Sequence, residues 1–273
     1  MTVDLALSTA QAGGDAAGDI LSNLQNLVGS AFDDYLTGTS AANVLTGGAG
    51  DDTLAGGAGA DTLDGGTGIN TVDYSASSAA VSVNLSTGTD TGGDAAGDVL
   101  TNFQNLTGSA FGDTLTGDAN DKLLSGGAGN DSITGGGGDD TLAGGAGSDT
   151  LDGGSGDNTA DYSTSTSGVT VNLTVATAQT SGGDASGDVL TNTQNLTGSA
   201  FDDSLTGDGN ANWLSGGAGD DTLVGGGGAD TLDGGVGVNT ADYSASSAGV
   251  TVVLTLTGSQ TSAGDASGDV LID

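Results

Sequence analysis

A nine-residue unit that repeats in frame constrains this chain more than any other feature. Residues 47–64 read GGAGDDTLA followed at once by GGAGADTLD, with Gly at positions 1, 2 and 4, Asp at position 6 and Leu at position 8. The unit returns in residues 126–152 as GGAGNDSIT, GGGGDDTLA and GGAGSDTLD, and in residues 216–233 as GGAGDDTLV and GGGGADTLD. Consecutive copies in one frame are a specific signal, and they predict an array of stacked units.

Each unit divides into a turn and a short strand. The six residues GGxGxD favour a tight turn because Gly reaches positive φ without steric cost. The remaining three, such as residues 53–55, favour a strand in which Leu54 points to one face while Thr53 and Ala55 point to the other. The turn carbonyls and the Asp carboxylate are hard oxygen donors, and calcium takes about 6–8 of these, so several turns would share one ion.

The unit is similar to the GGxGxDxUx nonapeptide of the RTX family, the hemolysin-type calcium-binding repeats. This resemblance implies an all-β fold, an elongated, right-handed parallel β-roll or β-solenoid in which two nonapeptides make one coil. It also implies multiple Ca²⁺ ions, each bound between turns n and n+2 on the same side. RTX proteins are typically exported by type I secretion with a signal near the C-terminus, so the resemblance implies an extracellular, secreted or cell-surface protein.

Composition agrees with a fold that depends on metal. All 36 acidic residues are Asp, Lys122 is the only Lys or Arg, and the formal net charge of the 273 residues is −35. Such a charge density repels itself in a compact state, so we expect a disordered chain without metal and a folded one with calcium. The charge argues against nucleic acid as a partner. No apolar run is long enough for membrane insertion, and residues 1–11 do not resemble a signal peptide.

A longer repeat encloses the nonapeptides. One alternating strand recurs at residues 1–5 (MTVDL), 81–85 (VSVNL), 169–173 (VTVNL) and 250–254 (VTVVL). The chain is therefore expected to divide into unit one (1–80), unit two (81–168), unit three (169–249) and a partial unit (250–273). Their nonapeptide blocks cover residues 29–73, 108–161 and 198–242, with five, six and five copies. Between strand and block, an apolar run such as Val99, Leu100, Phe103 and Leu106 favours short strands, although a helix is possible.

Position 6 supplies the candidate metal ligands. Under the stacking that the resemblance implies, pairs with two carboxylates are Asp34–Asp52, Asp113–Asp131, Asp131–Asp149 and Asp203–Asp221. An amide replaces one charge in Asp52–Asn70, Asp140–Asn158, Asp221–Asn239, Asn43–Asp61 and Asn212–Asp230, so these sites are expected to be weaker. The turn glycines complete the predicted set: Gly48, Gly50, Gly57, Gly59, Gly127, Gly129, Gly136, Gly138, Gly145, Gly147, Gly217, Gly219, Gly226 and Gly228.

Two features leave alternatives open. Lys122 occupies position 6 of GDANDKLLS, two turns before Asp140. Either its ammonium fills the place of the cation, or the side chain points to solvent and the register shifts so that Asp121 serves. The motif GDxxGD, with Asp94 and Asp98 as one of its four copies, forms either further calcium sites or only a turn. Its other copies contain Asp15 and Asp19, Asp184 and Asp188, and Asp265 and Asp269.

The aromatic residues have structural interpretations. Phe32, Phe111 and Phe201 are expected to plug the roll where a loop becomes a turn. Tyr74, Tyr162 and Tyr243 are expected to be strand residues at the ends of the blocks, and Trp213 to point outward beside Leu214.

These features favour a calcium-binding extracellular structural repeat array: an adhesin stalk, a surface-layer element or a filament that folds on binding Ca²⁺. Residues 1–21 resemble residues 250–271, so either the chain was cut from a longer array or its ends assemble head-to-tail into a homo-oligomer. An enzyme is not expected because His, Cys, Glu and Arg are absent. The alternatives are a polysaccharide- or ice-binding module, with outward Thr at position 7, or the RTX accessory region of a secreted enzyme.

Overall fold

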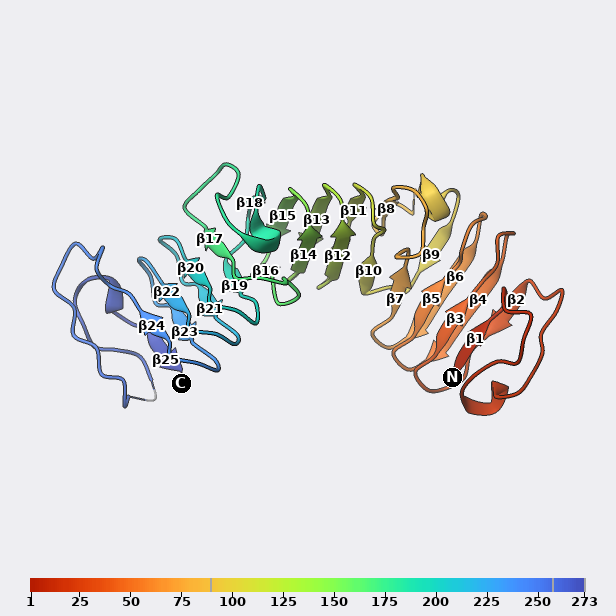
Figure 1. The fold of residues 1–273 in the computed structure, drawn as a ribbon, viewed down its shortest axis with the longest axis horizontal. Helices are drawn as coiled ribbons and strands as arrows, with labels where there is room; N and C mark the ends of the chain where they lie inside the picture. The colour runs from red at the N-terminus through yellow and green to blue at the C-terminus, as the bar shows by residue number, and fades with distance from the viewer. Residues whose placement is uncertain (89, 257, 273) are drawn as a thin grey trace. The chain divides into compact units, whose positions relative to one another are not determined.

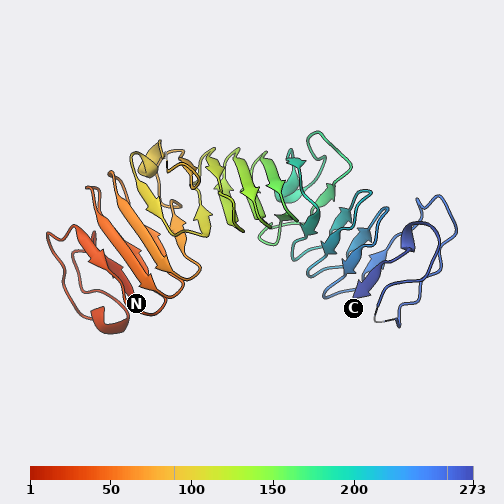
Figure 2. The same ribbon diagram turned by 180° about the vertical axis from the view of Figure 1, so that it is seen from behind.

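The structure is a computed structural model that describes residues 1–88, 90–256 and 258–272. These residues form strands, turns and four 3-10 turns, without an α-helix. The chain divides into two compact units, Met1–Gly137 and Gly138–Asp273. In both units, strands of the same series lie side by side as parallel rungs, while strands that follow one another directly along the chain, such as β1 and β2, belong to different series, as Figure 1 and, from behind, Figure 2 show. The all-β, parallel fold expected of RTX repeats is therefore confirmed.

The first unit contains three series of parallel strands. One series is β1 (Thr2–Asp4), β3 (Tyr35–Thr37), β5 (Thr53–Ala55), β7 (Thr71–Asp73), β10 (Asn105–Thr107) and β12 (Leu123–Ala128). The second is β2 (Asn26–Val28), β4 (Val44–Ala49), β6 (Thr62–Thr67) and β9 (Val99–Thr101). The third is β8 (Ser82–Asn84), β11 (Thr114–Thr116) and β13 (Ser132–Gly137).

The second unit repeats this arrangement. One series is β14 (Thr141–Ala146), β16 (Thr159–Asp161), β19 (Asn195–Thr197), β21 (Trp213–Ser215), β23 (Thr231–Asp233) and β25 (Val270–Ile272). A pair is formed by β15 (Thr150–Ser155) and β18 (Val189–Thr191). A further series is β17 (Thr170–Asn172), β20 (Ser204–Thr206), β22 (Thr222–Val224) and β24 (Thr240–Ala241). The 3-10 turns are η1 (Gly14–Ala16), η2 (Gly93–Ala95), η3 (Gly183–Ala185) and η4 (Gly264–Ala266).

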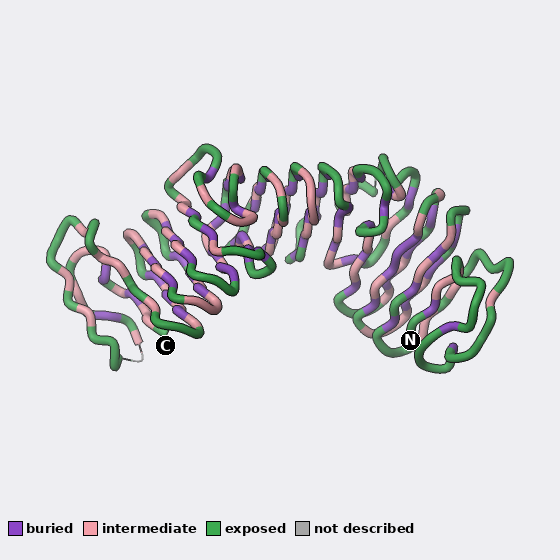
Figure 3. Tube along the Cα trace, in the orientation of Figure 1, coloured by how far each residue is buried: buried purple, intermediate pink, exposed green. Residues whose placement is uncertain are grey.

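The core is a stack of position-8 side chains. Leu36 pairs in register with Leu54, and Leu54 with Val72; all three side chains are fully buried. Figure 3 shows the result as buried residues that alternate along the strands with half-buried or exposed ones. Each such Leu contributes roughly 1.5–3 kcal/mol by leaving water, and a strand pattern with period two places the whole set on one face.

Glycine at positions 2 and 4 is required by the turn and by the coil beneath it. Gly48 and Gly50 both adopt φ of 117°, a region that L-residues rarely enter. A Cβ at Gly50 would lie 2.6 Å from the carbonyl carbon of Phe32 and 2.7 Å from the nitrogen of Asp33. The turns are therefore stacked too closely for side chains at these positions.

Two expectations need correction, and one open alternative is decided. Phe32, Phe111 and Phe201 do not plug the roll: their exposed fractions are 77%, 45% and 48%, because they occupy position 4 of a turn, where the side chain points outward. Residues 250–254 form no strand, whereas β1, β8 and β17 each pair with a strand that follows more than 30 residues later. Residues 258–272 contain no equivalent partner. The apolar run does form short strands, β9 and β10, rather than a helix.

Candidate metal sites

The position-6 side chains stack into ladders where the turns enter the strands. The backbone N–H of Asp34 donates to Oδ1 of Asp52 over 2.9 Å, and the N–H of Asp52 donates to Oδ1 of Asn70 over 3.0 Å. Each bond joins residues 18 positions apart. The ladder therefore connects turn n to turn n+2.

The same bond unites the other predicted pairs within each unit. It joins Asn43 to Asp61, Asp113 to Asp131, Asp140 to Asn158, Asp203 to Asp221, Asn212 to Asp230 and Asp221 to Asn239, over 2.7–2.9 Å. The predicted partners are thus neighbours, while their role as metal ligands stays a prediction. The pairs Asp131–Asp149 and Lys122–Asp140 take one residue from each unit and also stay predictions.

The ladders continue past the nonapeptides. The N–H of Asp61 donates to Oδ1 of Asp98 over 2.8 Å, and the N–H of Asn70 donates to Oε1 of Gln104 over 2.8 Å. Asp188, Gln194 and Asp269 do the same for Asp149, Asn158 and Asp230. The sequence signal for Asp98 was its place directly before the strand residues VLT, as Asp61 stands directly before TLD. The second Asp of GDxxGD is therefore a ladder residue in these three copies.

A tyrosine closes each of the three extensions that end in an aspartate. The hydroxyl of Tyr74 donates to Oδ2 of Asp98 over 2.9 Å, and Tyr162 and Tyr243 bind Asp188 and Asp269 over 3.0 and 2.8 Å. Tyr74 directly follows β7 rather than lying within it. Burial, followed by the nearby Asp98 charge, raises the pKa of Tyr74 above its ordinary value. The hydroxyl is thus a stable donor, and both oxygens of Asp98 have partners.

The aspartates inside the blocks differ from Asp98 in one respect. Oδ2 of Asp52, Asp61, Asp221 and Asp230 is buried and has no hydrogen-bond partner. Beside the first of these atoms lies Gly47, where a built Cβ would clash with Oδ2 of Asp52 and would lie 2.6 Å from the carbonyl oxygen of Gly65. A carboxylate oxygen and a carbonyl oxygen thus flank a stretch of backbone that carries no side chain. Buried acceptors without donors are costly unless a cation satisfies them.

Burial also opposes ionisation of these carboxyl groups. It raises the pKa of Asp61 and of Asp230 to about 6, with further contributions from the neighbouring charges of Asp98 and Asp269. The pKa of Asp52 is also raised, first by burial and then by the charge of Asp34. A bound cation would reverse this tendency and keep the carboxylates ionised.

Asparagine at position 6 has an amide donor in place of the second carboxylate oxygen, and this donor finds a carbonyl partner within the chain. The side-chain amide of Asn70 donates to the carbonyl of Asn102 over 3.2 Å, and that of Asn43 to the carbonyl of Gln25 over 3.0 Å. Among the described residues, no Asn side chain has a buried oxygen without a hydrogen-bond partner. Turns with Asn therefore need a cation less than turns with Asp do.

The donor set fits calcium. Carboxylate and carbonyl oxygens are its preferred ligands, and one site takes about 6–8 of them. Among the described residues, no group of three or more acidic, His or Cys side chains is arranged so that these side chains alone could hold a metal ion. Backbone carbonyls of the glycine turns would therefore complete a site held by one or two position-6 side chains, such as Asp34 and Asp52. When bound, the ion would supply the positive charge that these buried oxygens lack.

Lys122 occupies the place of a carboxylate in its turn. Its side chain is 1% exposed and its Nζ lies 2.7 Å from Oδ1 of Asp118. Its Cγ lies beside Gly117, as Oδ2 of Asp52 lies beside Gly47. Strand β12 keeps its register with β10, and Asp121 is exposed, so the alternative with a solvent-exposed Lys122 and a shifted register is wrong.

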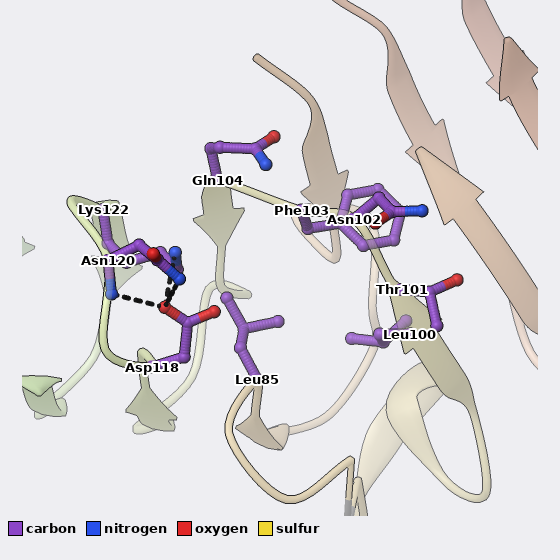
Figure 4. Close-up of a pocket in the computed structure, with 9 residues that line it drawn as sticks. All are labelled: Leu85, Leu100, Thr101, Asn102, Phe103, Gln104, Asp118, Asn120 and Lys122. Carbon is purple, nitrogen blue, oxygen red and sulfur yellow. Dashed lines mark hydrogen bonds and ion pairs between the residues drawn. The ribbon is translucent and has the colours of Figure 1, made fainter. Parts of the chain in front are cut away.

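The ammonium of Lys122 is thus held within its own turn. Figure 4 shows Lys122, Asp118 and Asn120 along one side of a pocket of about 390 Å³, with Leu85 and Phe103 among the other lining residues. Partial burial disfavours the charge of Asp118, but hydrogen bonds from Lys122 and Asn120 outweigh it and lower its pKa. This turn therefore contains a built-in cation.

Comparison with known proteins places the chain in a family. Among the described residues, no helix is long and apolar enough to cross a bilayer. A search of curated proteins found no significant match. The family model of the RTX calcium-binding nonapeptide repeat (4 copies) matches residues 37–72, 104–133, 125–160, 192–223 and 206–241, about half of the chain. The matched segments contain the stacked turns and their buried Asp side chains, and these repeats indicate a calcium-binding region. The chain therefore belongs to the RTX family of calcium-binding repeat proteins.

Proposed function

We propose that this protein is an extracellular structural array, such as an adhesin stalk, a surface-layer element or a filament, that folds when it binds calcium after secretion. The observation that carries the proposal is the set of buried Oδ2 atoms without partners in successive coils, represented by Asp52, Asp61, Asp221 and Asp230. A chain with many such groups and a net charge of −35 gains most of its stability from a cation.

The calcium concentration outside cells suits such a switch. Extracellular calcium modules bind with dissociation constants of about 10⁻⁴–10⁻³ M, so they stay metal-free where calcium is scarce. The free energy of binding then becomes free energy of folding, because the turns form a site only when stacked. An unfolded chain before export and a folded one afterwards is the expected consequence.

We also propose that this array is not an enzyme. The sequence offers neither His, Cys, Glu nor Arg as base, nucleophile activator or oxyanion ligand. The buried Asp side chains recur from coil to coil and already take part in backbone hydrogen bonds. An RTX accessory region beside a separate catalytic domain would behave identically in the experiments below, and assay of the natural full-length polypeptide distinguishes it.

Head-to-tail association is a further part of the proposal. Residues 1–21 and 250–271 share the same order of motifs, and repeated elements can stack end to end into filaments. Multi-angle light scattering in millimolar calcium tests it. A mass that rises with protein concentration supports assembly, and a constant monomer mass refutes it.

Far-ultraviolet circular dichroism during a calcium titration tests the proposed function. We expect a change from coil to β-structure near 0.1–1 mM calcium, the range of extracellular modules, and no equivalent change with magnesium. A complete β-sheet signal in excess chelator would refute calcium-dependent folding, because the Leu core and the strand ladder would then suffice.

Polysaccharide binding is the second candidate. Trp213 is 56% exposed, and with Thr159 and Asn195 it lines a concavity of about 270 Å³. An exposed indole beside hydroxyl and amide groups is a suitable sugar platform. A glycan array with a Trp213→Ala control tests this. Ice binding has less support, because Tyr35 and Asn105 interrupt the row of outward residues at Thr53 and Thr71.

A further inference from the structure

In three of the four copies of the long repeat, a glutamine holds the loop that follows the alternating segment by two hydrogen bonds to one residue of that segment. Oε1 of Gln11 accepts from the N–H of Asp4 over 2.8 Å, and its Nε2 donates to the carbonyl of the same residue over 2.8 Å. Gln179 binds Asn172 in this way over 3.0 and 3.1 Å, and Gln260 binds Val253 over 2.9 and 3.1 Å. The clamp thus needs one acceptor and one donor on the same side chain.

The repeat that contains β8 has an aspartate at this place. Oδ1 of Asp90 accepts from the N–H of Asn84 over 2.9 Å, as Oε1 of Gln179 does from Asn172. The carbonyl of Asp90 accepts from the N–H of Gly97 over 3.1 Å, as that of Gln179 does from Gly187. Asp90 and Gln179 are therefore structurally equivalent.

Asp90 lacks the donor half of the clamp. It is 5% exposed, and its Oδ2 is buried without a hydrogen-bond partner. The carbonyl of Asn84 keeps a bond from the turn N–H of Gly88 over 2.8 Å, but no side-chain amide donates to it. In the other repeats, the Nε2–H of the glutamine joins the side chain to the strand carbonyl. Here both groups, Oδ2 of Asp90 and the carbonyl oxygen of Asn84, are acceptors.

The charge around Asp90 also calls for a cation. The neighbouring Asp98 is buried, and its pKa is raised to about 6, first by burial and also by the charges of Asp90 and Asp94. In the equivalent loop, neutral Gln179 stands near Asp188 instead. The only Lys or Arg of the sequence, Lys122, forms an ion pair with Asp118.

We propose that Asp90 binds a calcium ion outside the nonapeptide repeats, and that this ion takes the place of the glutamine amide. Oδ2 of Asp90 and the carbonyl oxygen of Asn84 are its protein ligands, with water completing the shell. Carboxylate and carbonyl oxygens are hard donors suited to Ca²⁺. The ion connects residues 90–98 to β8, so this segment requires calcium, whereas the segments with Gln11, Gln179 and Gln260 are held by the chain itself.

The matched variants Asp90→Gln and Gln179→Asp test the proposal. Bound calcium per chain is measured by elemental analysis after equilibrium dialysis of the full chain against saturating calcium. We expect one ion fewer for Asp90→Gln and one ion more for Gln179→Asp. Gln is the residue of the three equivalent positions, so the first variant should fold, and a circular dichroism spectrum checks this.

An unchanged ion count in both variants would overturn the proposal. Oδ2 of Asp90 would then carry a proton and donate to the carbonyl of Asn84 in the manner of a glutamine. If one variant fails to fold, the ion count of the other decides. Failure of calcium-dependent folding would appear as a wild-type chain already folded in chelator, whereas failure of this proposal appears as unchanged counts in variants that still fold with calcium.

Discussion

Replacing Asp52 by Asn should change stability in opposite directions with and without calcium. Oδ2 of Asp52 is buried and unpartnered, while Oδ1 accepts from the N–H of Asp34 over 2.9 Å. Asn can keep the second bond, because native Asn70 accepts from the N–H of Asp52 in the same geometry. Its amide can also donate to a carbonyl, as that of Asn70 does. Asp52→Asn thus removes a buried charge and supplies a donor.

The expected change in the free energy of unfolding can be estimated separately for the calcium-free and the calcium-bound chain. In chelator, relief of a buried acceptor without a partner should stabilise the fold by about 1–3 kcal/mol. In calcium at about 100 times the dissociation constant, one site contributes about 2.7 kcal/mol, and the variant loses part or all of this. The effect in calcium should therefore be up to about 2.7 kcal/mol less favourable than the effect in chelator, so that complete loss of the site leaves the variant between about equal to the wild type and about 2 kcal/mol less stable in calcium.

Circular dichroism under two conditions measures the difference. In calcium, urea unfolding gives the free energy of unfolding; in chelator, trimethylamine N-oxide induces folding, and its midpoint gives the relative stability of the variant. The reciprocal variant Asn70→Asp is the matched control, with the opposite sign expected in each condition. If Asp52→Asn destabilised the fold equally in both conditions, Oδ2 would have no unmet need for a cation and the reasoning would be refuted.

Three further predictions follow from neighbouring features. Leu115→Ala should lower the free energy of unfolding in calcium by about 2–5 kcal/mol in urea titrations, because Leu115 is fully buried, and a loss below 1 kcal/mol would contradict a tight core. Tyr162→Phe should cost about 1–3 kcal/mol by removing the donor to Oδ2 of Asp188, whereas an unchanged urea midpoint would show that water replaces the hydroxyl. In chelator, acidification should stabilise the folded chain. Burial raises the pKa of Asp188 to about 7 and that of Asp98 to about 6, above the ordinary value of 3.8. The folded state therefore binds more protons than the unfolded state between pH 4 and 7, and the free energy of unfolding falls as pH rises through that window. Trimethylamine N-oxide midpoints at pH 5 and pH 7.5 check this; the sign should reverse in limiting calcium, where protons compete with the ion.

Much of the fold was predictable because the nonapeptide ties each backbone requirement to one residue type. Gly50 stands where the turn needs positive φ, Leu54 where the strand meets the core, and Asp52 between them. The n to n+2 stacking came from the family resemblance, and the bond from Asp34 to Asp52 confirms it. The outward position of Phe32 could also have been predicted, since it occupies the place of Gly50 in the preceding coil.

Other features were hidden because they depend on contacts across a loop. The bond from Tyr74 to Asp98 spans 24 residues, and the loop between them has no repeat period from which the contact could be predicted. The clamp of Gln11 on Asp4 was also not predicted, although a signal existed, since a Gln follows the clamped residue by seven positions in three of the repeats. The nature of the turn at Lys122 required the observed ion pair with Asp118 to decide between two interpretations.

The ladders satisfy some buried acceptors in two ways and leave others without a donor, and this difference predicts where calcium is needed. Asn70 uses its own amide, Asp98 uses the hydroxyl of Tyr74, and Asp52 and Asp61 have no donor for Oδ2. Residues with an internal donor stand at the ends of a block, and those without one stand inside it. We therefore expect metal dependence to be concentrated within each block, while its borders are held by the chain itself. Because stability in stacked repeats is transmitted between neighbours, an ion bound inside a block also stabilises the self-satisfied coils that flank it.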